Sequence, residues 1–279
     1  MILLTPLLFA LSVLPPEQTH SAHAQSIEDA WTTLEAGLDS NADKRAKAVR
    51  ALGLLVRNPK AQTLAEKALA DTSAEVRVEA ATALGQMGAK SAQPQLEKAI
   101  GDTDLKVVVA AANSLYIFKN PAAYEVYYAL LTGERKGPGV VKTQMNMFKD
   151  RKQMEKLMFE TGVGFVPFGG MGLQAFRTLT HDDTSPVRAL ATEKLATDRD
   201  PKTSEALEKA CSDKQWRIRL AAVEAIAKRG DHSLLKSVRP LLYEGNDEVR
   251  FAAAAAVIRL SGSSAPRANS ANKQHSTGD

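Results

Sequence analysis

The sequence predicts an all-α solenoid, a stack of about seven helix pairs, and two observations carry this prediction. The first is composition: the 279 residues are 44% hydrophobic but only 5% aromatic, too apolar for a disordered polymer and too poor in aromatic and β-branched residues for a typical β-sandwich. The second is an internal repeat of about 31 residues, which is the signature of repeat architectures. The formal charge of +4 is small for this length and does not demand a nucleic-acid partner.

Each copy of the repeat begins with an acidic residue and continues with a Val-Arg pair and an alanine-rich run that ends in Leu or Ile. The clearest copy is DTSAEVRVEAATALG at residues 71–85. Successive copies start 32, 31, 80, 31 and 31 residues apart, and the step of 80 is expected to contain one more unit with an insertion. The first residues of the copies are Asp39, Asp71, Asp102, Asp182, Asp213 and Glu244.

A second amphipathic segment precedes each copy, for example at residues 92–100 and 204–210, so one unit is expected to be a helix, a turn and a helix. Two short helices cannot bury an apolar face alone, so each pair must stack on its neighbours and share one continuous core. Small alanine side chains let the helix axes approach closely. The Asp, Ser or Thr before each second helix is expected to cap that helix.

These units resemble the HEAT-repeat superfamily. Their pattern D-x-x-x-x-V-R-x-x-A-A-x-A-L-G is most similar to the short bacterial HEAT-like repeats also found in phycobilisome lyases, and the resemblance covers residues 27–261. The chain is therefore expected to form a right-handed α-solenoid of about seven HEAT-like helix pairs with an elongated central pair. Such repeats serve unrelated tasks, so the resemblance is specific for the fold and not for a function.

The resemblance also implies a structural ladder, in which the acidic residue and the arginine of the motif join one unit to the next. In the first copy Arg45 follows Lys44 where valine is usual, and in the third copy Val108 replaces the arginine. The ladder is expected to be broken at these two copies. Its predicted members are Asp71, Asp102, Asp182 and Asp213 with Arg77, Arg188, Arg219 and Arg250.

The N-terminus is predicted to be a secretory signal peptide. Residues 2–14 form an apolar run of 13 residues, and an Ala-His-Ala cleavage pattern ends at Ala24. The run is shorter than the ~20 apolar residues of a membrane-spanning helix, which makes a retained anchor the weaker alternative. The usual basic region is missing, because no Lys or Arg precedes Lys44. We expect an exported protein, periplasmic or extracellular, from which residues 1–24 are removed.

The mature chain is expected to contain a solenoid over residues 25–261 and a disordered tail over residues 262–279. The tail has no aliphatic residue larger than alanine. Residues 134–181 form an atypical insertion within the solenoid, and five of the seven methionines of the chain lie between residues 145 and 171.

The first part of the insertion has a helical periodicity with one basic face and apolar residues around it. It is interpreted either as a long core helix with a solvated lysine stripe or as an adaptable surface that binds an acidic or amphipathic partner. The residues of this predicted partner-binding surface are Lys142, Lys149, Lys152, Lys156, Met154 and Met158.

A glycine-rich apolar loop follows at residues 161–172, and its glycines exclude a regular helix. The loop is expected either to cap the solenoid groove or to present Phe165 and Phe168 to a partner or to a membrane surface. Residues 170–175 match the GxGxxA pattern of dinucleotide sites, but Pro167 and the helical surroundings leave no place for the βαβ unit that such a site needs. No cofactor is expected.

Few side chains suit catalysis. Only His181 and His232 fall in the expected folded body, and Cys211 is the only cysteine of the chain. Neither a metal site nor a nucleophile with an adjacent base is predicted. Trp216 and Tyr243 are expected to be packing residues.

The sequence therefore favours an exported, non-catalytic scaffold or adaptor that binds another protein in the cell envelope. One alternative is a phycobilisome-lyase-like enzyme or chaperone for chromophore attachment, as the repeats imply. Another is a nucleic-acid-binding HEAT-like protein, which would need a cytoplasmic location and a basic concave face.

Overall fold

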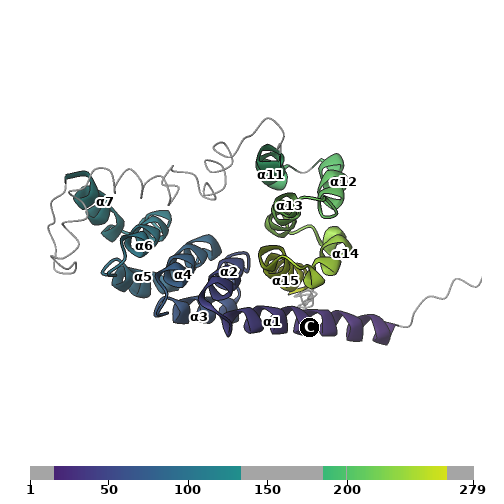
Figure 1. The fold of residues 1–279 in the computed structure, drawn as a ribbon, viewed down its shortest axis with the longest axis horizontal. Coiled ribbons are helices and arrows are strands. Elements are labelled where there is room, and N and C mark those ends of the chain that lie inside the picture. Colours follow the sequence, from purple (N-terminus) through teal and green to yellow (C-terminus); the bar gives the residue numbers. More distant parts are fainter. Residues whose placement is uncertain (1–15, 133–184, 199, 263–279) are drawn as a thin grey trace, which may run out of the picture.

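The computed structural model describes residues 16–132, 185–198 and 200–262, and all regular secondary structure in these ranges is helical (Figure 1). We refer to residues 16–132 as the N-terminal half and to residues 185–262 as the C-terminal half. The predicted all-α solenoid is confirmed. The elongated central pair, the insertion over residues 134–181 and the C-terminal tail lie outside the described residues.

The helices are short and follow one another through tight turns. The N-terminal half contains α1 (Pro16–Leu38), α2 (Ala42–Leu52), α3 (Pro59–Ala68), α4 (Ala74–Met87), η1 (Lys90–Ala92), α5 (Gln93–Ala99), α6 (Leu105–Ile117) and α7 (Ala122–Thr132). The C-terminal half contains α11 (Ser185–Lys194), η3 (Leu195–Thr197), α12 (Pro201–Ala210), α13 (Trp216–Arg229), η4 (His232–Leu234), α14 (Leu235–Val238), η5 (Arg239–Tyr243) and α15 (Asp247–Gly262).

The helix termini are fixed by local side chains, as the composition of the turns suggests. The side chains of Asn58 and Asp104 accept hydrogen bonds from amides in the first turns of α3 and α6. Gly88 and Gly230 end α4 and α13 with φ angles of 69° and 66°, a left-handed conformation that glycine adopts without strain. The acidic residue that opens each motif lies one step earlier: Asp71 accepts from the amide of Ser73, in the turn before α4.

The helices form two rows. In the inner row α6, α4, α2, α15, α13 and α11 pack against one another in that order, and in the outer row α5, α3, α1, α14 and α12 each pack against their inner neighbour. Figure 1 shows the inner row as an arc with the outer helices on its convex side. The order in space differs from the order in the chain, because the first and last repeats lie side by side in the middle of the stack.

This junction of the two halves is a packed apolar contact. Phe251 of α15 is 2% exposed and lies over Gly37 of α1, beside the fully buried Ala30 and Leu34. At the far end of α15, the guanidinium group of Arg259 donates a hydrogen bond to the carbonyl oxygen of Leu54 at 2.7 Å. Residues more than 200 positions apart therefore pack as neighbouring repeats do.

The predicted ladder joins neighbouring repeats through bidentate or single charged hydrogen bonds. Nε and Nη2 of Arg77 donate to the two carboxylate oxygens of Asp102 at 2.7 and 2.8 Å, and Nη1 donates to the carbonyl oxygen of Asp71. Arg77 thus ties the turn of its own repeat to the carboxylate of the next. The other contacts of this type are Arg188 to Asp213 at 2.6 Å and Arg219 to Glu244 at 2.8 Å.

Two details of the ladder differ from the prediction, and a third is not tested. Arg45 donates two hydrogen bonds of 2.9 Å to Asp71, so the expected break at the first copy is wrong: the guanidinium group makes the contact whatever residue precedes it. Arg250 pairs with Asp247 of its own helix and not with a carboxylate of a neighbouring repeat. Asp182 lies outside the described residues.

Helix α1 runs without interruption across the predicted cleavage point after Ala24. Among its residues 25–38, those that pack on the core are Ile27, Ala30, Trp31, Leu34 and Leu38. Cleavage after Ala24 would therefore leave these contacts in place. In the part of the chain that the structure describes, no helix combines the length and the apolar character needed to span a membrane.

Replacing Gly37 with alanine is expected to destabilise the junction, because the added Cβ atom would lie 2.6 Å from Cζ of Phe251 and 2.9 Å from Cβ of Ala48. Overpacking costs about 1–3 kcal/mol, more than the gain of about 1 kcal/mol in helix propensity. Urea unfolding measures the net loss. The matched control is Gly262→Ala, where nothing lies within 4 Å of the added atom. Equal stability of the two variants would contradict tight packing at Gly37.

Arg77→Gln is expected to lower the free energy of unfolding by about 2 kcal/mol at neutral pH, because two charged hydrogen bonds to Asp102 are lost. Burial acts to raise the pKa of Asp102, but the hydrogen bonds from Arg77 and from the amide of Asp104 lower it overall. The stabilisation is thus present above the ordinary aspartate pKa and is lost as the pH falls through the lowered pKa.

Urea unfolding at neutral pH and in acid measures this dependence. The difference between wild type and Arg77→Gln should shrink below about pH 4. Arg57→Gln is the control, since Arg57 is exposed. A difference that stays constant into strong acid would rule out the ion pair as its cause.

Candidate functional site: a charged cluster on the concave face

The surface that the sequence predicts to bind a partner is not covered by the structure. The residues concerned lie outside the described ranges, and their role remains a prediction. They are Lys142, Lys149, Lys152, Lys156, Met154, Met158, Phe165 and Phe168. His181 also lies outside these ranges.

The described residues with reactive side chains have structural surroundings. Cys211 is 4% exposed, and burial raises the pKa of its thiol to about 12, so the thiolate is not available at neutral pH. Nδ1 of His232 contacts the carbonyl oxygen of Leu260. In the described part of the chain, no group of three or more His, Cys, Asp or Glu side chains is arranged to hold a metal ion.

The two aromatic residues singled out in the sequence differ from each other. Trp216 is partly buried against the core, as expected. Tyr243 is 82% exposed, so its expected packing role is wrong. The reason is local: Leu241 and Leu242 of the same 3-10 turn are the residues that face the core, and Tyr243 ends the turn on the outside.

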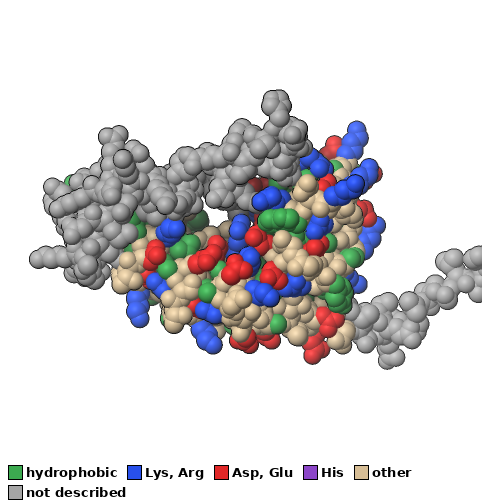
Figure 2. Space-filling view, in the orientation of Figure 1, with side chains coloured by type: hydrophobic (Ala, Val, Ile, Leu, Met, Phe, Trp, Pro, Cys, Tyr) green, Lys and Arg blue, Asp and Glu red, His purple; other side chains and the backbone are tan. Residues whose placement is uncertain are grey.

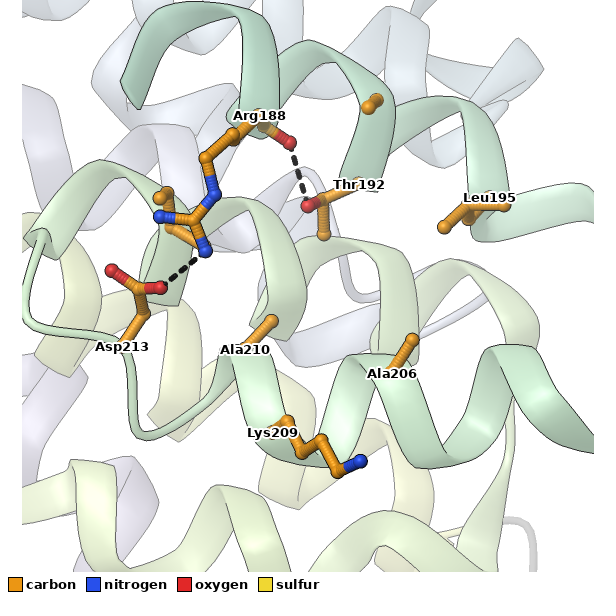
Figure 3. Close-up of a pocket in the computed structure, with 9 residues that line it drawn as sticks. Arg188, Thr192, Leu195, Ala206, Lys209, Ala210 and Asp213 are labelled. Atoms are coloured by element: carbon orange, nitrogen blue, oxygen red, sulfur yellow. Dashed lines mark hydrogen bonds and ion pairs between the residues drawn. The ribbon is translucent and has the colours of Figure 1, made fainter. Parts of the chain in front are cut away.

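A pocket of about 370 Å³ lies between α11, α12 and α13 (Figure 3). Its walls are largely apolar, and its polar groups are already engaged: Arg188 points toward Asp213 at 2.6 Å, and the hydroxyl group of Thr192 donates to the carbonyl oxygen of Arg188. The ammonium group of Lys209 points away from the cavity in Figure 3. We therefore interpret the pocket as a gap between packed repeats. Its described lining residues do not bring reactive groups together.

The strongest concentration of uncompensated charge lies on the inner row. Five partly buried side chains come from five inner helices and influence one another electrostatically: Arg50 of α2, Glu79 of α4, Glu193 of α11, Glu224 of α13 and Glu248 of α15. We call them the concave cluster. The space-filling view shows acidic and basic side chains interspersed across the middle of the stack, beside the hollow of the arc (Figure 2).

The position of this cluster follows from which charges interact. Arg50 interacts with Glu193, although α15 and α13 lie between their helices in the inner row. Side chains on the outside of an arc diverge, whereas those on the inside converge. The concave cluster therefore lies on the inner surface of the arc, and both halves contribute to it.

The pKa shifts in the concave cluster show how its charges act on one another. Burial acts to lower the pKa of Arg50, but the surrounding carboxylates raise it overall. Burial is the main cause that raises the pKa of Glu79 and of Glu224, and the other glutamates add to it. Arg50 lowers both pKa values, and Lys228 also lowers that of Glu224. Glu193 has a partner in Lys228, at 3.9 Å. The side chains of Glu79, Glu224 and Glu248 form no hydrogen bond or ion pair within the described residues.

A signal for this site exists in the sequence but was not recognised. Arg50, Glu193 and Glu224 each lie five residues after a ladder arginine, in the middle of the alanine-rich run. Charged residues at this repeated position mark a face that neither the core nor the ladder uses. Glu79 and Glu248 lie elsewhere in the repeat, two residues from a ladder arginine.

The fold and the repeated motif define an α-helical repeat protein with an extended concave surface. The family model of HEAT repeats matches residues 32–112, 61–137 and 173–258, which together make up more than half of the chain. The chain belongs to the HEAT repeat family. No curated protein sequence matches it.

Several solved structures show similarity to the chain, among them the three that follow. A chain from the complex of CpcE and CpcF of phycocyanin lyase from Nostoc sp. PCC7120 is 18% identical, over 92% of this chain and 99% of that one, with a TM-score of 0.32. Human deoxyhypusine hydroxylase in complex with glycerol is 14% identical, over 90% and 92%, with a TM-score of 0.32. An engineered protein is 18% identical, over 84% and 97%, with a TM-score of 0.28. Scores this low carry no argument about function.

Glu224→Gln is expected to stabilise the protein at neutral pH, by up to about 1 kcal/mol. The pKa of Glu224 is raised in the folded state, so its ionisation disfavours folding as the pH rises above the ordinary pKa of a glutamate. The gain should shrink as the pH falls toward that ordinary pKa. Thermal unfolding at several pH values measures it, with the exposed Glu205→Gln as control. A variant less stable than wild type at neutral pH would show that Glu224 supports the fold.

Proposed function

We propose that this protein is a non-catalytic protein-interaction scaffold whose concave face binds a basic segment of a partner protein. The observation that supports this most directly is the set of unpaired carboxylates of Glu79, Glu224 and Glu248 on the inner row. Partly buried carboxylates without partners destabilise a fold, whereas Lys or Arg side chains of a bound segment would pair with them. The same glutamates would repel an acidic segment of a partner, so the surface would select against acidic partners.

The choice of a protein partner rests on the family and on the shape of the surface. HEAT repeats commonly mediate protein interactions, and stacked repeats create long concave surfaces suited to extended segments. Nucleic acid is disfavoured as a partner, because its phosphates would face the carboxylates of the concave cluster. The predicted surface of the insertion, around Lys149 and Phe165, would be a second contact for a partner.

An enzymatic role is the second candidate, and it rests on the same carboxylates. A carboxyl group whose pKa is raised by burial, such as those of Glu79 and Glu224, is suited to donate a proton as a general acid. A phycobilisome-lyase-like enzyme or chaperone for chromophore attachment would bind a pigment. Visible absorbance of the purified protein would therefore support this candidate over the scaffold.

We further propose that the scaffold is exported and acts in the cell envelope. The apolar run at residues 2–14 and the cleavage pattern ending at Ala24 support this proposal. The packing of α1 is compatible with it, because Ile27, Trp31 and Leu34 follow the cleavage point. N-terminal sequencing of the protein from the envelope fraction would test the start at residue 25.

Crosslinking and capture from the envelope fraction tests the proposed function with the mature chain 25–279. The variant Glu79→Gln/Glu224→Gln/Glu248→Gln removes the unpaired charges of the concave face. We expect it to lose a captured partner at least tenfold, since three charged contacts are removed. The control variant Glu28→Gln/Glu125→Gln/Glu205→Gln has the same change in net charge at exposed positions of α1, α7 and α12, and should retain the partner.

The outcomes separate the two predicted surfaces. A partner that both variants retain, but that is lost by Lys149→Glu/Lys152→Glu/Phe165→Ser/Phe168→Ser, would assign binding to the insertion. A partner retained by all three variants would contradict both surfaces. Loss of capture at raised salt concentration would support charged contacts, because salt screens exposed charges.

A further inference from the structure

The junction between the halves lacks the ladder contact that joins the other neighbours in the inner row. Within the described residues, each remaining neighbouring pair is tied by an arginine of one repeat and a carboxylate of the next. At the junction, Arg250 pairs instead with Asp247 of its own helix. The side chain of Asp39, which holds the equivalent place in the first repeat, forms no hydrogen bond or ion pair with any described residue. One ion pair joins α2 and α15 in the described part of the chain, that of Lys44 with Asp247 at 3.9 Å.

The charges of the concave cluster also act across this junction. Glu79 belongs to the N-terminal half and is repelled by Glu224 and Glu248 of the C-terminal half, while Arg50 attracts both. Asp247 and Glu248 of α15 also attract Lys47 of α2, so attraction and repulsion between charges act together at the junction. Apolar packing of Phe251 on α1 and the hydrogen bond of Arg259 hold it together.

The two faces of the junction are nevertheless fully complementary. The face of α1 and α2 offers a seat at Gly37 that fits the ring of Phe251, and the face of α15 offers that ring and the guanidinium group of Arg259. No covalent bond near the junction joins these faces. They are linked only through the chain that runs from α7 to α11.

We propose that the same junction forms between two copies of the chain, with α15 of each copy docked on α1 and α2 of the other. Such an exchange uses contacts that the fold already contains and keeps the apolar faces of α1 and α15 covered. Each concave cluster then combines Arg50 and Glu79 of one copy with the three glutamates of the other. The site stays complete in the dimer, and its two halves belong to different copies. This inference does not depend on the proposed function.

Docking within one chain competes with docking between chains. Because the two halves of one chain are covalently linked, each meets the other at an effective concentration in the millimolar range. At a micromolar protein concentration, the junction therefore forms mainly within one chain. The test must therefore disfavour closure within a chain without damaging the faces needed between chains. A reciprocal change of size at Gly37 and Phe251 does this.

The experiment uses two full-length chains with different tags. The Gly37→Leu chain cannot seat its own Phe251, because even a Cβ atom at position 37 would lie 2.6 Å from the ring. The Phe251→Ala chain leaves a cavity at its own Gly37. When the two chains pair, one junction is wild-type and the other combines the large residue with the small one. The control is the double variant Gly37→Leu/Phe251→Ala, which restores the fit within one chain.

We expect the mixture, refolded together, to give a species of two-chain mass that carries both tags, as measured by light scattering and tag capture. Each single variant alone and the double variant should give a one-chain mass. A mixture that gives only one-chain masses, while the double variant regains stability, would overturn the proposal. If the double variant does not regain stability, wild-type protein refolded at about 1 mM decides: a two-chain species that persists on dilution supports the exchange, and its absence overturns it.

Discussion

The packing of Phe251 over Gly37 determines the arrangement of the whole molecule. It makes the first and last repeats neighbours, so that the inner row runs unbroken from α6 to α11. Without it, each half would end in an uncovered apolar face, with Ala30 and Leu34 on one side and Val257 on the other. The concave cluster depends on the same contact, because its residues come from both halves and meet only when the junction is closed.

The fold was predictable from the sequence where it depends on local physics. The 31-residue period, the alanine-rich runs and the caps specify helix pairs, because each unit repeats the same steric and hydrogen-bonding needs. The closure of the two halves was not predictable, because periodicity gives the neighbours along the chain but not the partner of a terminal repeat. Gly37 was the one local hint. A glycine inside a helix costs about 1 kcal/mol relative to alanine, and here it makes room for Phe251.

The ladder and the concave cluster differ in how far sequence reasoning could reach. Ladder residues such as Arg77 and Asp102 occupy fixed places in the motif and find each other one repeat away. The error at Arg45 came from requiring the preceding residue to match the motif, although the guanidinium group alone makes the contact. In the cluster, Arg50 and Glu224 interact although they are 174 residues apart in the sequence. They come close only because the two halves of the chain pack against each other.

The same residue types thus have opposite effects at two places in one fold. In the ladder, arginine contacts lower the pKa of Asp71, and ionisation favours the folded state. On the concave face, burial raises the pKa of Glu79 and Glu224, and ionisation of these side chains disfavours the folded state. Acid therefore weakens the links between repeats while it relieves the repulsion across the junction. Apolar residues on that face would serve stability better than carboxylates do, and the presence of carboxylates there agrees with the cationic partner that we propose.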